Sequence, residues 1–173
     1  GAGTFTAPCE ENNFEVCPYL AESWEANADF TEWKFKIRND AFWHDGTPYT
    51  AYDAHWWVQI AYNGAKGRKP EPYKPNLGGI TDLAVEGDTL TISLDEPFAA
   101  YPSMFSEIEM WHPRHLFQPE IDKGNATVWA NEVGFVGTGP WKFKKYDKGS
   151  IFQAERFSQF WQKDEKGNRL PYM

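Results

Sequence analysis

Paired carboxylates are the first candidates for chemistry, because glycosidases cleave sugars with two acids that face each other across the scissile bond. Glu107 and Glu109 lie two residues apart, a spacing that places both on one face of a strand. Two adjacent acid pairs occur as well, Glu10-Glu11 and Asp95-Glu96. No feature of their spacing fixes the separation across a cleft that the reaction needs. Solvated surface acids are the simpler interpretation, and the sequence assigns no catalytic residue.

Histidines could instead bind a metal ion. Glu109, His112 and His115 are spaced three apart and could share one helical face. Pro113 lies between the two histidines and disfavours helical backbone at His112, so we assign no metal site. His44 and Asp45 form an adjacent pair in a loop. Phosphate-binding loops and serine- or cysteine-nucleophile motifs are not found, and we expect no cofactor.

The two cysteines, Cys9 and Cys17, are close in sequence and enclose a polar run with prolines near both ends. That composition indicates a surface loop, in which a disulfide would stabilise the fold by about 2–3 kcal/mol. A bridge would suit an oxidising compartment outside the cytoplasm. The alternative is a pair of free thiols in a loop, and we favour the bridge.

Aromatic residues are unusually frequent, with nine Trp, eight Tyr and thirteen Phe in 173 residues. The tryptophans whose spacing predicts packing in a core are Trp33, Trp43, Trp56, Trp57 and Trp141. Trp111 and Trp161 are harder to place, and exposed Trp can stack on sugar rings or apolar side chains. This composition, with the acidic charge, motivates one alternative function: a secreted carbohydrate-binding module or glycosidase fragment. A structural domain of a cell-surface protein is a further alternative.

The formal net charge of -8 argues against a nucleic-acid partner, because phosphate binding needs clustered Lys and Arg. The short basic run from Lys142 to Lys148 alternates with aromatic residues, which predicts the solvent face of a strand. No stretch reaches the ~20 apolar residues of a membrane-spanning helix. The chain opens on Gly1-Ala2-Gly3, which we interpret as a tag remnant or processed end.

These residues must be positioned by hairpins and helices. Residues 1–18 lack periodicity and are predicted to form an N-terminal arm. Alternation over 32–38, with a partner at 23–28, predicts a hairpin, and 83–85 with 90–94 predict a second one. A third is expected from Trp141 to Glu155, with its turn at 147–149.

Helices are predicted between these hairpins. Thr50 followed by Asp53 is typical of a capping box, and the helix should run to Tyr62, with Tyr52, Trp56 and Ile60 in one apolar stripe. Shorter helices are expected within 99–105, 113–119 and 126–133. Residues 64–79 are predicted to be a loop. Hairpins separated by helices give an α+β fold with mainly antiparallel pairing.

Several segments, in this order, resemble family 5 of the bacterial extracellular solute-binding proteins, the dipeptide- and oligopeptide-binding subunits of ABC importers. The segments that carry the resemblance are Leu20-Ala-Glu-Ser-Trp-Glu, Trp33-Lys-Phe-Lys-Ile-Arg, Phe42-Trp-His-Asp-Gly-Thr-Pro, Thr50-Ala-Tyr-Asp-Ala, Leu94-Asp-Glu-Pro-Phe-Ala, Pro113-Arg-His, Gly137-Thr-Gly-Pro-Trp-Lys-Phe and Glu155-Arg-Phe-Ser-Gln-Phe-Trp161. The segment from Cys9 to Cys17 and the 64–79 loop depart from the family pattern.

The resemblance implies a two-lobed, type II periplasmic-binding fold, of which residues 19–173 would form part of lobe I with its small subdomain. It implies a substrate-binding protein rather than an enzyme, located in the periplasm or at the cell surface, lipid-anchored or secreted. Its partners would be a peptide or other small solute and a membrane permease. The same resemblance implies that Glu109, Met110 and Trp111 approach the ligand cleft between the two lobes, and these three residues are the expected ligand contacts.

Overall fold

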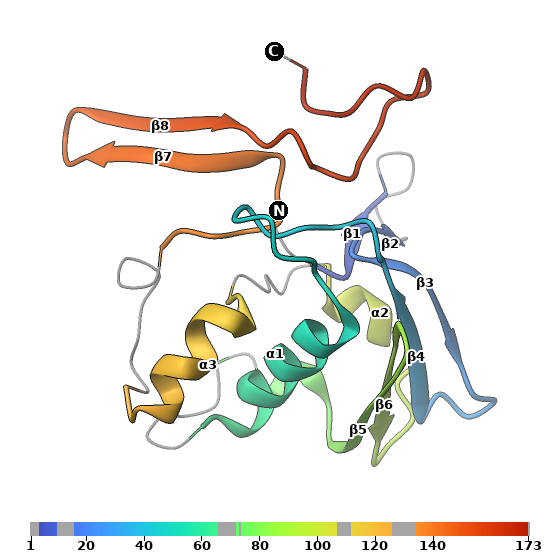
Figure 1. Cartoon of the computed structure of the whole chain (residues 1–173). Coiled ribbons are helices and arrows are strands. Elements are labelled where there is room, and N and C mark those ends of the chain that lie inside the picture. The colour runs from blue at the N-terminus through green and yellow to red at the C-terminus, as the bar shows by residue number, and fades with distance from the viewer. Residues whose placement is uncertain are drawn as a thin grey trace.

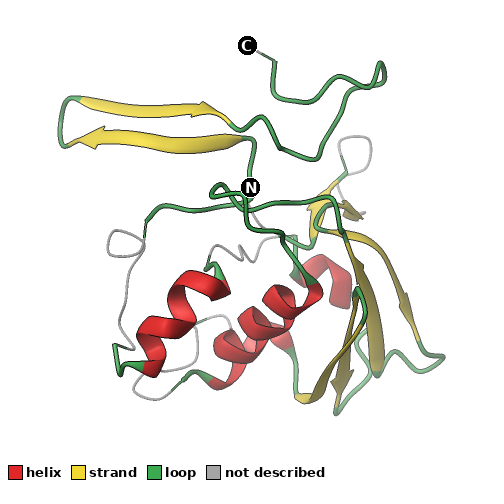
Figure 2. Ribbon diagram, viewed as in Figure 1, coloured by secondary structure: helices red, strands yellow, loops and turns green. Residues whose placement is uncertain are grey.

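A computed structural model describes residues 4–9, 16–65, 72, 74–106, 112–125 and 134–172. The chain forms a body, made of a four-stranded sheet with helices against it, and a separate hairpin that extends above it (Figures 1 and 2). The elements in chain order are β1 (Thr6–Pro8), β2 (Val16–Pro18), β3 (Ala21–Ala26), β4 (Glu32–Ile37), α1 (Ala51–Asn63), the 3-10 helix η1 (Lys74–Leu77), β5 (Ile80–Glu86), β6 (Thr89–Leu94), α2 (Tyr101–Met104), α3 (Arg114–Asp122), β7 (Trp141–Asp147) and β8 (Ile151–Arg156). The predicted α+β class is confirmed.

The central sheet is antiparallel throughout, with strand order β3-β4-β6-β5. Side chains alternate along β4, so that Trp33, Phe35 and Ile37 are buried while the lysines between them are exposed. Phe35 lies opposite Leu90 of β6, and Leu90 lies opposite Val85 of β5. Both hairpins predicted from period-two alternation, 23–28 with 32–38 and 83–85 with 90–94, are therefore confirmed.

Helix α1 covers one face of this sheet, packing on β5 and β6 (Figure 1). Its predicted start is confirmed, since the Asp53 carboxylate accepts hydrogen bonds from the backbone N–H of Thr50 at 2.9 Å and from its hydroxyl at 2.6 Å. This capping box satisfies a backbone donor that the helix itself leaves free. The predicted apolar stripe was wrong at one position, because Tyr52 is 57% exposed.

The other predicted helices are found in part. Helix α2 is shorter than the expected 99–105 segment, and α3 continues through Pro119 to Asp122. Part of the 64–79 loop forms η1, which the Tyr101 hydroxyl anchors by donating to the Leu77 carbonyl at 2.9 Å. The segment 126–133 lies outside the described residues. Among the helices that the structure does describe, none is long and apolar enough to cross a membrane.

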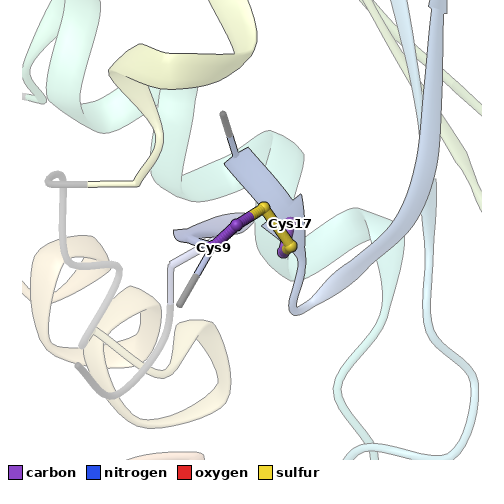
Figure 3. Close-up of a disulfide and its surroundings, with 2 residues drawn as sticks. All are labelled: Cys9 and Cys17. Carbon is purple, nitrogen blue, oxygen red and sulfur yellow. A yellow bond between two sulfur atoms is a disulfide. The ribbon is translucent and has the colours of Figure 1, made fainter. Parts of the chain in front are cut away.

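The N-terminal segment is integrated into the body although its sequence lacks periodicity. Strands β1 and β2 pair as a small hairpin, and Phe5 just before β1 is fully buried against Phe35 and Phe105. The Thr6 hydroxyl donates to the Pro102 carbonyl at 2.8 Å. Cys9, which follows β1, forms a disulfide with Cys17 of β2, with the two Cα atoms 5.2 Å apart (Figure 3).

The third predicted hairpin, β7–β8, is confirmed, with its turn at 147–150. It extends away from the body, and the chain then returns along the body's upper side (Figure 1). Phe157 and Phe160 are buried on this return. Trp161 lies under the Arg38 guanidinium, 3.8 Å from its carbon to the ring centroid, which provides a cation–π contact between the return segment and the body.

Candidate functional site

The hairpin β7–β8 presents an aromatic face. Phe143 lies opposite Ala154, and Tyr146 lies opposite Phe152, so all four share one face. Simple alternation would have placed Tyr146 on the other side. A β-bulge between Phe143 and Lys145 shifts the register by one residue and brings Tyr146 back to the face of Phe143.

Beneath this face lies a cavity of about 540 Å³. It is lined by His44, Phe135, Val136, Gly137, Trp141, Phe143, Tyr146, Phe152 and Ala154. Phe143 contacts Phe135 and Phe152, with ring centroids 4.7 and 5.9 Å away. Such a surface can bury apolar groups and stack on flat ones.

The aromatic side chains of the hairpin remain largely open to solvent. Trp141, Tyr146 and Phe152 are 47%, 60% and 67% exposed. The prediction that Trp141 packs in a core was therefore wrong in this structure. The reason is that, among the described residues, the cavity on this face of the hairpin is bordered outside the hairpin by the short 135–137 segment and His44 alone.

His44 closes the floor of the cavity and joins it to the body. Its backbone N–H donates to the Gly137 carbonyl at 2.8 Å, its Nδ1 accepts from the Gly137 N–H at 3.1 Å, and its Nε2 lies 2.9 Å from the Gly139 carbonyl oxygen. Phe157 packs edge-on against the ring at 4.9 Å. Burial is the main cause that lowers the pKa of His44; the hydrogen bond to the Gly139 carbonyl opposes it, the charge of Lys142 adds to it, and the charge of Asp45 opposes it least.

Asp45 binds His115 of α3, with Oδ2 2.6 Å from Nε2. Burial raises the pKa of this carboxyl, but hydrogen bonds from His115 and Thr47 outweigh it, and the net pKa is lowered. His112 instead packs edge-on against Phe117, 4.7 Å away. The two histidines that could have shared a metal thus have different surroundings. No cluster of three or more His, Cys, Asp or Glu suited to a metal occurs within the part of the chain that is described.

The predicted ligand contacts Glu109, Met110 and Trp111 lie outside the described residues, so the structure does not place them. The same holds for the acid pairs Glu10-Glu11 and Glu107 with Glu109. Asp95 and Glu96 are exposed just after β6. Of the side chains that line the hairpin cavity, His44 and Tyr146 are the titratable ones. The cavity can therefore hold an apolar group, and the described residues that line it include no pair of acids.

Sequence reasoning missed the connection between His44 and the Gly137–Gly139 segment. Both stretches belong to segments that carry the family resemblance, but they are more than 90 residues apart. Local periodicity carries no signal for a contact at that separation. The bulge in β7 was missed too, and the aromatic run Trp141, Phe143 and Tyr146, with spacings of two and then three, was the available hint.

Comparison with known proteins identifies the family. The model for bacterial extracellular solute-binding proteins, family 5 (middle region), matches residues 15–173. A dipeptide-binding protein of Bacillus subtilis is 26% identical over 169 residues, 85% of this chain and 29% of that protein. A putative ABC transporter peptide-binding protein of Brucella ovis is 35% identical over 133 residues, 73% of this chain and 23% of that protein.

Solved structures agree on the fold. NikZ from Campylobacter jejuni, in complex with Ni(L-His), superposes with a TM-score of 0.77 at 24% identity, over 96% of this chain and 32% of NikZ. AppA from Bacillus subtilis, in complex with a nonapeptide, gives 0.71 at 19% identity, over 92% of this chain and 31% of AppA. This chain thus spans less than a third of these relatives. With the family match running over residues 15–173, the chain belongs to family 5 of the bacterial extracellular solute-binding proteins.

Proposed function

We propose that this chain is part of the substrate-binding component of an ABC importer, which captures peptides or similar small solutes outside the cytoplasmic membrane. The family match over residues 15–173 carries the proposal. Relatives named as dipeptide-binding and peptide-binding proteins support peptides as the first solutes to test. Because the chain covers less than a third of such relatives, the activity described here is that of a longer protein.

Within that protein, we propose that residues 19–173 form part of lobe I with its small subdomain, with an N-terminal segment that packs on it through the buried Phe5. The open aromatic face of β7–β8 supports this division. A two-stranded hairpin alone is only marginally stable in water, and an aromatic face of this kind ordinarily packs on a helix or another sheet. The rest of the lobe would supply that cover, and the 540 Å³ cavity would then become interior.

Capture needs no covalent chemistry. A solute enters between two lobes, exchanges water for a few convergent polar partners, and shifts a hinge equilibrium toward the closed form. Glu109, Met110 and Trp111 are the solute contacts we propose on this side of the cleft. The closed protein then docks on a membrane permease. We assign no catalytic residue, no cofactor and no metal, and we place the protein in the periplasm or on the cell surface, secreted or lipid-anchored.

A chimera tests the proposal directly. Residues 15–173 replace the matching segment of the Bacillus subtilis dipeptide-binding protein, and calorimetry follows the addition of a dipeptide. We expect a single saturable site in the chimera and very weak or no binding to the isolated chain, because half of the pocket is absent from it. A cooperatively folded chimera without dipeptide binding would contradict the proposal, as would micromolar peptide binding by the isolated chain.

The carbohydrate alternative is tested in parallel. The isolated chain is incubated with cellulose, xylan and chitin, and both co-sedimentation and released sugar are measured. We expect neither, since the family match supports the binding of small solutes rather than of polysaccharides. Retention on any of the three polymers, lost when Trp141→Ser removes an exposed ring, would favour the carbohydrate-binding alternative instead.

A further inference from the structure

His44 lies where two stretches of the chain far apart in sequence meet. It belongs to the loop between β4 and α1, and its partners Gly137 and Gly139 belong to the segment that leads into β7. Three hydrogen bonds, one through the His44 backbone and two through its ring, join these stretches. Phe157, which directly follows β8, packs on the same ring and donates its backbone N–H to Pro140 at 2.9 Å. Both ends of the hairpin thus converge on one imidazole.

The partners fix the protonation state of that imidazole. The Gly137 N–H can only donate, so Nδ1 must keep its lone pair. The Gly139 carbonyl can only accept, so Nε2 must carry the proton. The ring is therefore the neutral Nε2–H tautomer. A second proton, on Nδ1, would point one N–H at another and remove the bond that the Gly137 N–H donates to the ring.

We propose that His44 is the positioning residue of the β7–β8 hairpin, a clasp that fixes the hairpin over the body while the ring is neutral and releases it when the ring is protonated. The clasp sits at the floor of the aromatic cavity, so its opening changes the wall that Phe143 and Trp141 form. The proposal concerns this chain alone and does not depend on the identity of any solute.

The charges around His44 set the direction of the response. Asp45, on the same loop, favours the protonated ring, but its carboxylate is already bonded to His115 of α3. Lys142 of β7 disfavours protonation, and Phe157 adds no charge. Burial is the largest influence, and it too favours the neutral form. The clasp is therefore closed above the usual His pKa of about 6.5 and opens as the pH falls through a lower value.

Nitrogen NMR of the wild-type chain tests the clasp. Long-range proton–nitrogen correlation should show Nδ1 of His44 as the unprotonated nitrogen and Nε2 as the protonated one, with a titration midpoint below 6.5. Exchange of the Gly137 amide should accelerate by about tenfold or more, relative to the Leu90 amide of β6, as the pH falls through that midpoint. Each of three results would overturn the proposal. They are a proton on Nδ1 instead of Nε2, a His44 midpoint at or above 6.5, and a Gly137 exchange rate, relative to Leu90, that does not change at the His44 midpoint.

Two variants distinguish an effect of His44 from an effect of the adjacent Asp45–His115 pair. His44→Phe keeps a flat aromatic ring and removes both side-chain hydrogen bonds, so Gly137 should exchange fast relative to Leu90 at every pH. His115→Gln is the matched control, because it removes the histidine on the other side of Asp45 and should leave the Gly137 midpoint in place. If His115→Gln abolishes the pH response, the Asp45–His115 pair is the trigger and the clasp is refuted. Should His44→Phe fail to fold, the wild-type tautomer and titration still decide.

Discussion

The four-stranded sheet and the β7–β8 hairpin use the same kind of sequence with opposite results. In β4, Trp33 and Phe35 alternate with charged residues and are buried, because α1 and α2 lie over that side of the sheet (Figure 1). In β7, Trp141 and Phe143 also alternate with lysines, yet Trp141 is 47% exposed, and Tyr146, which the bulge brings to the same face, is 60% exposed. Alternation thus predicts a strand with one apolar face, but what covers that face is decided by other parts of the chain.

The largest expected difference in stability between the sheet and the hairpin comes from replacing one aromatic residue in each by alanine. Phe35→Ala removes a fully buried ring that contacts Phe5 and Phe105, and should lower the free energy of unfolding by about 3–5 kcal/mol. Phe152→Ala, in the hairpin, should cost about 0.5 kcal/mol or less, because its ring is 67% exposed. Urea denaturation of the two variants measures both. Equal losses would mean that the hairpin face is covered in solution.

Reduction of the Cys9–Cys17 disulfide should have the next largest effect. It closes a short loop next to the buried Phe5, so its loss should lower the free energy of unfolding by about 2–3 kcal/mol. The measurement compares urea midpoints with and without reductant. The Cys9→Ser, Cys17→Ser double variant should match the reduced protein and should not respond to reductant. An unchanged midpoint on reduction would show that the N-terminal hairpin contributes little to the body.

Loss of the α1 cap is expected to be smaller. Asp53→Ala removes the acceptor for the Thr50 N–H and hydroxyl and should cost about 1 kcal/mol. The matched hairpin change is Asp147→Ala, whose ion pair with Lys145 is exposed and should cost less than about 0.5 kcal/mol. Thermal unfolding followed by circular dichroism compares the two. A larger loss of stability from Asp147→Ala than from Asp53→Ala would mean that the hairpin contributes more to the stability of the fold than the start of α1 does.

Local features of the fold could be predicted from the sequence, and contacts between distant segments could not. Alternation around Phe35 located β4, and Thr50 with Asp53 located the start of α1, because neighbouring residues supply those signals. The spacing of Cys9 and Cys17 likewise suggested the bond that the structure contains. By contrast, the burial of Phe5 depends on Phe105, which directly follows α2 and is about 100 positions away.

The candidate site was predictable to a smaller extent for the same reason. His44 and Gly137 were each noticed, but a loop histidine gives no indication of which distant backbone it will bind. The exposure of Trp141 was not predictable either, because an aromatic residue in an alternating strand has the same pattern whether or not a helix covers it. The family resemblance predicted the fold class and the family, but it carried no information on the contacts that His44 and Trp141 make within this chain.

The smallest expected effect is on the 164–172 turn, which follows the hairpin. It tests whether this segment is held by internal hydrogen bonds, as the body is, or is largely exposed, as the hairpin is. Asp164 accepts hydrogen bonds from the Tyr172 hydroxyl, the Asn168 side chain, and the backbone N–H groups of Asn168 and Lys166. Led by the bond from Tyr172, these lower the pKa of its carboxyl to about 2. A lowered carboxyl pKa means that the turn is stabilised while Asp164 is ionised and that this contribution disappears as the pH falls through about 2.

The 164–172 turn should therefore stay ordered at about pH 3, where an ordinary aspartate is already mostly protonated. Carbon NMR of the Asp164 carboxyl reports its titration, and the Asn168 amide reports the order of the turn. Asp164→Ala removes the acceptor and should disorder the turn at every pH, while Asp147→Ala in the hairpin should leave it unchanged. An Asp164 midpoint near the ordinary value would mean that this segment, exposed like the hairpin, also lacks the internal bonding that holds the body together.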